Sequence, residues 1–347
     1  MVGAGATPPP AFRRTGTCLV ILVTGGTGHL GANLVRRLLA DQAAVRVLVR
    51  PGSRGEALDG LPVERVEGDL RDEDALARAV SGCERVYHCA ARISTRAGRE
   101  RELFDCNVAG TGNLLAAARR ADVRRVVVTG SLSAVGHEPG RPSDETMPFY
   151  PFGQVLPYSH TKALVEHECL KAVVAGLDVV IAVSTAIVGP HDHGPSRLGR
   201  TLLDFARGRL RAYVPGGFEF VNAADLARGH LLAMERGTTG HRYIFSTQFL
   251  TVEQLLGLCA SALGRSVLPV RVPGPLMSAA AAVTDPLVRR LRPGAPQRFT
   301  PAAVRFLRSQ RRADTGKARR ELGYRPTSIA EAVAEAYACF RRRGLLR

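Results

Sequence analysis

The sequence predicts an α/β fold in which a parallel β-sheet is covered by helices on both faces. Short, nearly continuous apolar runs alternate with segments whose apolar residues recur at helical spacing, as in buried strands joined by crossover helices. The first apolar run also leads through a glycine-rich turn directly into a helix. With 347 residues, 45% of them hydrophobic, the chain can form one large domain and a smaller appended part.

The alternation starts after residues 1–17, which we expect to form a flexible tail because they lack the apolar core and cleavage site of a signal peptide. Strands are expected at residues 18–26, 44–50, 63–69, 84–91 and 123–131. Helices are expected at residues 29–41, 71–82 and 102–121. The second of these helices has acids in its first turn and Gly82 at its end, which are typical helix-terminal residues.

The turn after the first strand, VTGGTGHLG, carries glycines in a G-x-x-G-x-x-G pattern. Glycine at these points lets the backbone turn tightly and approach a pyrophosphate held at the N-terminus of the following helix. The strand–turn–helix context favours a dinucleotide site over a turn without a ligand, so residues 18–182 are predicted to be a Rossmann-type NAD(P)-binding domain. The predicted contacts are Gly25, Thr27, Gly28, His29, Leu30 and Gly31.

The end of the second strand indicates which dinucleotide binds. An NAD site commonly has an acid there for the ribose hydroxyls, and that acid would repel a 2′-phosphate. This strand continues into Arg50 and Arg54 without an acid, and two guanidinium groups can bind a phosphate. We therefore predict NADP(H), with NAD(H) as the alternative because arginine is abundant throughout the chain.

A tyrosine and a lysine lie four residues apart in LPYSHTKALVEHE, residues 156–168, at the expected start of a helix. Tyr158 and Lys162 would share one helix face. Taken alone, the pair is better explained as a polar pair on a solvated surface.

Further motifs give this pair a context. TGGTGHLG, EGDLRD, HCAA, NVAGT, VTGSLSAVG and PYSHTK occur in an order and spacing that resemble the extended short-chain dehydrogenase/reductases, also called the NAD-dependent epimerase/dehydratase family. The resemblance runs from about Cys18 to RELGYRP near the C-terminus. VRVLVRPGS, ARGHLLAMERG and RELGYRP look most like the dihydroflavonol-reductase-like branch, which includes bacterial hopanoid-associated sugar epimerases.

The resemblance implies a catalytic set of Ser131, Tyr158 and Lys162. A free phenol has a pKa near 10, and a lysine one turn away stabilises the phenolate, so that Tyr158 can act as general acid or base. Lys162 can also hold the cofactor ribose, and Ser131 would orient the substrate oxygen.

The same resemblance implies further contacts and an assembly. Asp69, with Leu70, would contact the adenine, Ala90 the nicotinamide ribose, and Asn107 would hold the water of a proton relay. A helix-capping role for Asp69 and a hydrogen bond within its helix for Asn107 remain alternatives. A homodimer through the helices that carry Asn107 and Tyr158 is also implied.

Three positions depart from the family pattern. The paired Ser or Thr before the reactive serine is Thr129-Gly130 here, and Ser133 is an alternative to Ser131. Ser184 stands where a proline is usual, which puts the backbone contact to the nicotinamide amide in doubt. The later histidine is replaced by Asn222, whereas Asp225 is retained.

Residues 183–347 are expected to form a substrate-binding part interleaved with the sheet, because the alternation of strands and helices becomes less regular there and the loops become longer. Nucleotide-sugar members of the family typically have a basic residue where this chain has Phe218-Glu219-Phe220, and an acid is poorly suited to a diphosphate. We therefore expect an apolar, uncharged substrate such as a flavonoid, steroid or polyketide ketone. His191-Asp192-His193 is interpreted as a loop over the cofactor, and no metal site is predicted.

The net charge of +17 is concentrated at the C-terminus, where residues 286–347 hold 16 basic and 4 acidic residues. A nucleic-acid or anionic-membrane surface would explain this charge, but no nucleic-acid motif accompanies it and arginine is frequent everywhere. No apolar run is long enough to span a membrane. The seven cysteines are scattered and form no C-x-x-C, which fits thiols in a reducing cytoplasm.

The sequence thus supports three hypotheses. The first is an NADP(H)-dependent oxidoreductase acting on the carbonyl or secondary alcohol of an apolar small molecule, with Tyr158 as general acid or base. The second is a sugar or nucleotide-sugar epimerase with tightly bound NAD. The third is a non-catalytic cofactor sensor or nucleic-acid-binding protein, against which the intact Tyr158–Lys162 pair argues.

Overall fold

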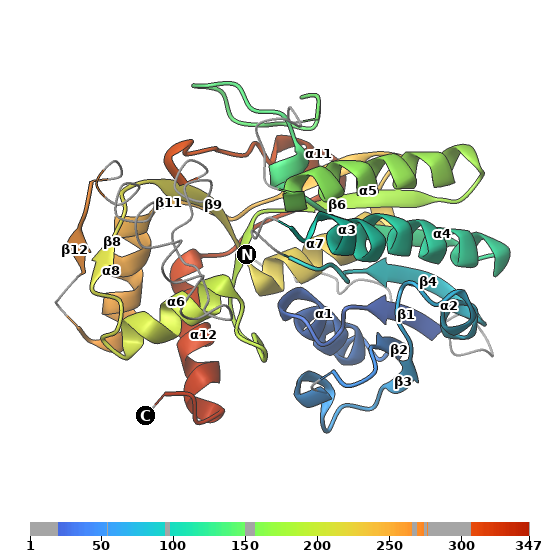
Figure 1. Ribbon diagram of the computed structural model, residues 1–347, viewed down its shortest axis with the longest axis horizontal. Helices are drawn as coiled ribbons and strands as arrows, with labels where there is room; N and C mark the ends of the chain where they lie inside the picture. The colour runs from blue at the N-terminus through green and yellow to red at the C-terminus, as the bar shows by residue number, and fades with distance from the viewer. Residues whose placement is uncertain are drawn as a thin grey trace, which may run out of the picture.

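A parallel, seven-stranded sheet organises the larger part of the molecule (Figure 1). The computed structural model describes residues 20–53, 55–93, 98–149, 157–265, 269–273, 276 and 307–346. The strand order is β10-β6-β5-β4-β1-β2-β3, and every neighbouring pair is parallel. The strands are β1 Val20–Thr24, β2 Ala44–Val49, β3 Glu64–Glu67, β4 Cys83–His88, β5 Arg125–Ser131, β6 Val179–Ser184 and β10 Arg242–Phe245. The prediction of a doubly wound α/β fold is therefore confirmed.

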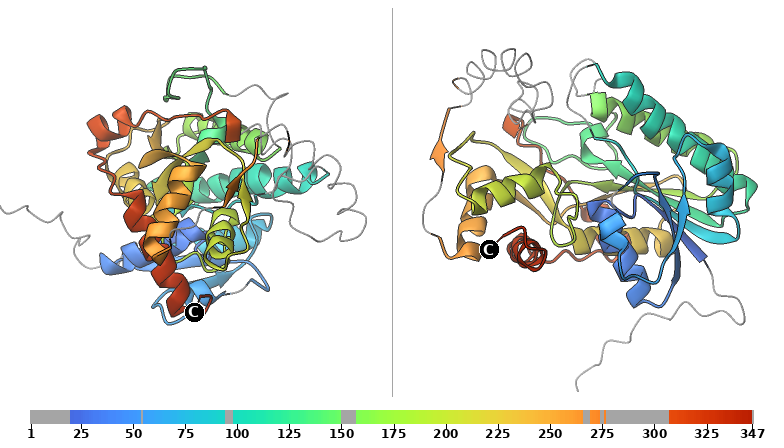
Figure 2. Two further views of the ribbon diagram at one scale, coloured as in Figure 1. Left: turned by 90° about the vertical axis from the view of Figure 1, so that its left-hand side faces the viewer. Right: turned by 60° about the horizontal axis from the view of Figure 1, so that its bottom comes forward.

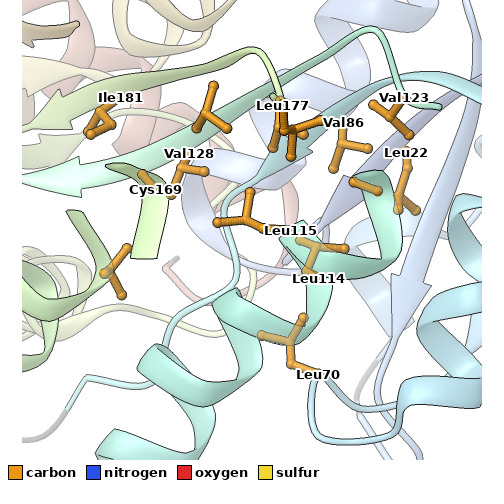
Figure 3. Close-up of a cluster of buried hydrophobic side chains, with 14 of the residues drawn as sticks. Leu22, Leu70, Val86, Leu114, Leu115, Val123, Val128, Cys169, Leu177 and Ile181 are labelled. Atoms are coloured by element: carbon orange, nitrogen blue, oxygen red, sulfur yellow. The ribbon is translucent and has the colours of Figure 1, made fainter. Parts of the chain in front are cut away.

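Helices cover both faces of this sheet, because strands that are apolar on both sides must be shielded from water on both. One face is covered by α1 His29–Ala40, α7 Ala223–Arg236 and α11 Gly316–Leu322. The other is covered by α2 Glu73–Val80, α4 Gly110–Arg120 and α5 Pro157–Val174. Figure 3 shows the core on this second face, where Leu114 and Leu115 of α4 lie near Val86 and Val128, and Cys169 of α5 lies near Ile181.

The long helix expected at residues 102–121 is interrupted. It consists of α3 Glu100–Leu103, a π-helical turn Phe104–Ala109 and α4. The periodicity of apolar residues does not reveal such a turn, because the π-turn continues the helix in the same direction. Turns of this type occur frequently at functional sites, and this one carries Asn107.

A smaller part is built mainly from the second half of the chain. It contains the sheet β11-β9-β7 and the pair β12-β8, with α6, α8 and α12 packed around a separate apolar core. Both views of Figure 2 show α8 beside α12. The elements are β7 Ala186–Val188, α6 Arg197–Ala206, β8 Ala212–Tyr213, β9 Gly217–Asn222, β11 Gln248–Thr251, α8 Val252–Leu263, β12 Val270–Arg271 and α12 Ile329–Arg342. Among the described residues, no helix has the length and apolar character needed to cross a membrane.

Asp225, in the first turn of α7, joins the two parts. Its Oδ2 accepts hydrogen bonds from the Thr247 hydroxyl at 3.1 Å and from the Thr327 backbone N–H and hydroxyl at 2.7 and 3.0 Å. Its Oδ1 pairs with Arg228. Asn222 caps the same helix by accepting the Ala224 N–H. Asn222, which replaces the usual histidine of the family, and the retained Asp225 therefore both stabilise the start of α7.

Replacement of Asp225 by alanine should therefore lower the free energy of unfolding by about 3 kcal/mol, because several buried donors lose their shared acceptor. Chemical denaturation of the purified protein measures this loss. Asp59→Ala is the control, since Asp59 forms an exposed pair with Arg65 and should cost less than about 1 kcal/mol. Equal losses in the two variants would contradict the role assigned to Asp225.

Candidate functional site

The site lies where neighbouring strands separate at the carboxyl edge of the sheet. The chain connections run in opposite directions from β1, toward β2 on one side and β4 on the other. Open α/β sheets bind ligands at this position. The β4–β5 pairing ends at His88 and Val128, whereas the β5–β6 pairing continues to Ser131 and Ser184. The end of β5 thus extends past its β4 partner.

The glycine turn after β1 is sterically tight. A Cβ at Gly25, whose φ is +72°, would lie 2.6 Å from the Ala90 nitrogen, and one at Gly31 would lie 2.2 Å from the Gly25 carbonyl oxygen. The turn can therefore be this tight only with glycine at both positions. Gly28, which is exposed, begins α1 without a side chain to cap it.

The N-terminus of α1 is suited to an anion. Its first N–H groups have no partner within the helix, and its first turn contains no acidic residue. Helices α2, α6, α7, α8 and α12, by contrast, begin with a side-chain cap. The predicted turn residues Thr27, His29 and Leu30 lie at this opening, with Thr27 half-buried and Leu30 buried. These features fit the pyrophosphate of a dinucleotide.

Two arginines, one after β2 and one after β3, act on Asp69. The side-chain hydrogen bond from Arg71 is the main cause that lowers the pKa of Asp69, and the charge of Arg50, which is exposed directly after β2, acts in the same direction. Arg71 donates to the two Asp69 oxygens at 2.7 and 3.1 Å. The Leu70 side chain is buried in the core beneath Gly110, so only its backbone is available to a ligand. Arg54 lies outside the described residues.

A directed chain of buried hydrogen bonds links the glycine turn to the π-turn. Thr111 donates to the Asn107 carbonyl at 2.5 Å, so its oxygen accepts from His88 Nε2 at 2.9 Å. His88 Nδ1 then accepts from the Thr24 hydroxyl at 2.7 Å, and that hydroxyl accepts the Ala90 N–H at 3.4 Å. Burial lowers the pKa of His88 to about 3, so the imidazole is neutral.

The hydroxyl groups expected for catalysis lie together at the end of β5. Burial raises the pKa of Tyr158 to about 12, and a side-chain hydrogen bond with Ser131 acts in the opposite direction. The Ser131 and Ser133 hydroxyls are 2.9 Å apart. The serine at the strand end therefore contacts the tyrosine, while Ser133 is positioned to polarise that serine.

Lys162 lies one turn after Tyr158 on α5 and is buried. Its Nζ donates to the carbonyl oxygen of Thr129 at 2.7 Å, which leaves two ammonium protons for other acceptors. Burial lowers the pKa of Lys162 to about 8, so the amine is mostly charged at neutral pH. A phenol, a hydroxyl and an ammonium group thus meet at one strand end, an arrangement that can transfer a proton to or from a substrate oxygen.

The side-chain amide of Asn107 is hydrogen-bonded to other residues of the protein. Its Nδ2 donates to the Arg92 carbonyl at 2.9 Å and to Thr161 Oγ1 at 3.1 Å, and its Oδ1 accepts the Arg92 N–H at 2.7 Å. These bonds reach outside its own helix, unlike the alternative considered from the sequence. Asn107 fixes the segment after Ala90 against α5, and its role in a proton relay stays a prediction.

The loop with His191-Asp192-His193 is held near the start of α1 by hydrogen bonds. His29 Nε2 donates to the Gly189 carbonyl at 3.2 Å, and Asn33 Nδ2 donates to the Pro190 carbonyl at 2.9 Å. Asp192 accepts the Ser196 N–H, with its two oxygens at 2.9 and 2.8 Å. Within the described residues, no group of three or more His, Cys, Asp or Glu side chains could hold a metal ion.

Residues that the sequence did not single out complete the site. Thr24, Thr111, Arg71 and His230 each contact a residue that it did, and His88 links Thr24 to Thr111. Arg71 could have been noticed, because it follows Asp69 by two residues in EGDLRD. Thr111 follows Asn107 by four residues, whereas the contacts of Thr24, His88 and His230 join distant parts of the chain, so no local pattern indicates them. At the departure Ser184, the hydroxyl donates to the Thr185 carbonyl at 2.9 Å.

The fold and this site define a class of protein. Residues 21–245 match the model of the NAD dependent epimerase/dehydratase family. The chain belongs to this family, and it is an NAD(P)-dependent enzyme of the short-chain dehydrogenase/reductase type.

Curated relatives match over nearly their full length. "Sterol demethylase protein B" of Methylococcus capsulatus is 48% identical, over 94% of this chain and 100% of the relative. A "putative dihydroflavonol 4-reductase" of Synechocystis is 35% identical, over 94% and 95%. A "3 beta-hydroxysteroid dehydrogenase/Delta 5-->4-isomerase" of Mycobacterium tuberculosis is 31% identical, over 88% and 86%.

Solved structures agree on the fold. The crystal structure of gox2253 superposes with a TM-score of 0.82 at 33% identity, covering 94% of this chain and 99% of the other. DesIV, a dTDP-glucose 4,6-dehydratase from Streptomyces venezuelae crystallised with NAD and TYD, has a TM-score of 0.77 at 27% identity, covering 95% and 99%.

Gly31→Ala should weaken binding of the nicotinamide dinucleotide by at least about tenfold, because the new methyl group would displace the backbone of the turn. Isothermal titration calorimetry measures this affinity. Gly257→Ala on α8 is the matched control, since a Cβ there meets nothing within 4 Å. That variant should bind normally and gain up to about 1 kcal/mol of stability. Normal binding by Gly31→Ala would contradict the assignment of the turn.

Proposed function

We propose that the chain is an NADP(H)-dependent oxidoreductase that interconverts a secondary alcohol and a ketone on an apolar, polycyclic small molecule of the sterol type. The observation that carries the proposal is the meeting of Ser131, Tyr158 and Lys162 at the end of β5. Their contacts are the Ser131–Tyr158 hydrogen bond and the anchoring of Lys162 on the Thr129 carbonyl. This group lies at the edge of the sheet where the glycine turn opens.

The cofactor would be held along this edge by residues already in place. The turn around Gly25 and the N-terminus of α1 would bind the pyrophosphate, and Arg50 would bind a 2′-phosphate. Ala90 and Lys162 would hold the nicotinamide ribose. When bound, the nicotinamide supplies or accepts the hydride at the carbon that bears the substrate oxygen.

Tyr158 would transfer the accompanying proton. With its pKa raised to about 12 by burial, its phenol is protonated at neutral pH and can donate to the oxygen of a ketone as that oxygen gains negative charge. In the opposite direction, the phenolate must form to remove the proton of an alcohol. The Lys162 ammonium favours that phenolate by its charge, and the Ser131 hydroxyl would hold the substrate oxygen in line.

The surroundings of Glu219 support an uncharged substrate. Glu219 lies on β9 at the place where nucleotide-sugar members carry a basic residue, and its side chain is buried. Its oxygens accept the Ser246 hydroxyl at 2.6 Å and the Ala313 N–H at 2.9 Å, and burial raises its pKa. A carboxyl group used in this way gives a sugar diphosphate no cation to bind.

The names of the relatives narrow the substrate class. The relative at 48% identity is named for sterol demethylation, and one at 31% for dehydrogenation of 3β-hydroxysteroids. Both names describe rigid, apolar, polycyclic molecules. The second also names the oxidation of a secondary alcohol, which is the reaction that the Ser131–Tyr158–Lys162 group suits. A 3β-hydroxysterol is therefore the proposed test substrate.

Tyr158→Phe should lower the turnover of a 3β-hydroxysterol by at least about a hundredfold, because phenylalanine cannot transfer the proton. The assay supplies the sterol in detergent micelles with NADP⁺ and follows reduced nicotinamide at roughly 340 nm. The dinucleotide affinity of the variant should stay close to that of the unmodified protein, which separates catalysis from folding.

Two outcomes would contradict the proposed function. One is an unmodified protein that turns over no apolar alcohol or ketone. The other is a protein that isomerises a nucleotide sugar with no net change in reduced cofactor, which would favour the epimerase hypothesis.

Arg50→Gln should raise the KM for NADP⁺ by roughly tenfold to a hundredfold, the effect of losing one hydrogen bond to a charged group. The KM for NAD⁺ should change little, because NAD⁺ has no 2′-phosphate. Arg37→Gln is the control, since Arg37 is an exposed residue of α1 that pairs with Asp41. An equal change for both cofactors would show that Arg50 does not select NADP(H).

A further inference from the structure

His230 is a buried histidine of α7 that belongs to the opposite helix layer from Lys162. Its side chain is fully buried, and its Nδ1 is 2.8 Å from the carbonyl oxygen of Leu226. A carbonyl oxygen can only accept, so Nδ1 carries the proton and Nε2 is an acceptor. The Thr129 hydroxyl, 2.9 Å away, therefore donates to Nε2.

The backbone of Thr129 explains why this hydrogen bond reaches the site. The Val126 N–H bonds to the Asp178 carbonyl at the start of β6, and alternate residues of a strand point to opposite neighbours. Thr129 therefore points its carbonyl toward β4, whose pairing with β5 stops at Val128. Among the described strands this carbonyl lies beyond the β4 pairing, and it receives Lys162 Nζ at 2.7 Å.

We propose that His230 is a positioning residue, which fixes the Thr129 peptide through the threonine hydroxyl and thereby sets where the Lys162 ammonium stands beside Tyr158. The inference rests on the proposed function for its effect on turnover. The contacts themselves, from Leu226 through His230 and Thr129 to Lys162, are independent of that function.

An apolar side chain could fill the same space, so the imidazole is present for its hydrogen bonds. Burial lowers the pKa of His230 to about 4, and the charge of Lys162 acts in the same direction, so the ring stays neutral. It can then accept from Thr129 without adding a second positive charge. Lys162 interacts electrostatically with six titratable groups, so that its pKa or theirs is shifted. They are His88, Cys89, Cys106, Glu166, Cys169 and His230.

The sequence makes a direct test practical, because the chain contains only three lysines, Lys162, Lys171 and Lys317. Lysine labelled with ¹³C at Cε allows each amine to be titrated by NMR, and Lys162→Met assigns its signal. His230→Leu should lower the pKa of Lys162 by roughly half a unit or more, because its charged form loses a fixed acceptor. His230→Gln, whose side-chain oxygen can accept from Thr129, should restore most of the shift.

Kinetics supply the second readout. His230→Leu should reduce kcat for alcohol oxidation by roughly tenfold to a hundredfold, with little change in the KM for NADP⁺. The acid limb of its pH–rate profile should move to higher pH, because the Tyr158 phenolate loses support from Lys162. Thr129→Val should behave alike, and the double variant should be no worse than either single one, since both remove the same hydrogen bond.

The outcomes separate the two proposals. Lys171 and Lys317 are internal controls and should titrate identically in every variant, and His241→Leu, at an exposed histidine, should leave Lys162 and kcat unchanged. An unchanged Lys162 titration in both His230→Leu and Thr129→Val overturns the role of His230, whatever the activity. An unmodified protein without turnover, but with the expected NMR shifts, overturns the proposed function instead.

Discussion

The hydrogen bond from Lys162 to the carbonyl of Thr129 is the contact on which the geometry of the site depends. A buried ammonium group is costly unless an acceptor is fixed beside it. The acceptor exists because β4 leaves the sheet at His88 while β5 continues to Ser131. One carbonyl is thereby freed from strand pairing, and it holds the helix that carries Tyr158 against the strand that carries Ser131.

The groups around this contact are neutral or already paired, so they add little net charge to the site. Burial lowers the pKa of His88 to about 3 and that of His230 to about 4, so both imidazoles act as neutral hydrogen-bonding groups. Glu166, one turn beyond Lys162, is paired with Arg242 of β10 at 3.1 Å. This pair ties α5 to the edge strand of the sheet. Lys162 is thus left as the charged group nearest to Tyr158 along its helix.

Local rules made part of this site predictable. Glycine at Gly25 and Gly31 follows from the steric limits of a tight turn, and a residue pair four apart shares a helix face in any helix. Asn107 shows where such rules stop. The apolar spacing around it indicates helix, but the π-turn that presents it and its bonds to Arg92 and Thr161 depend on segments 15 and 54 residues away. Spacing within one segment carries no information about such contacts.

The sequence by itself determined the strand–helix alternation, the glycine turn and the Tyr158–Lys162 pair, because each follows from the conformations available to neighbouring residues. Tertiary structure alone decided how these parts meet. It brought His230 to Thr129 across 101 residues, used Asp225 to join α7 to Thr327, and placed Arg50 where its charge lowers the pKa of Asp69. These contacts form only when the layers pack, since buried polar groups must then find partners wherever the folded chain supplies them.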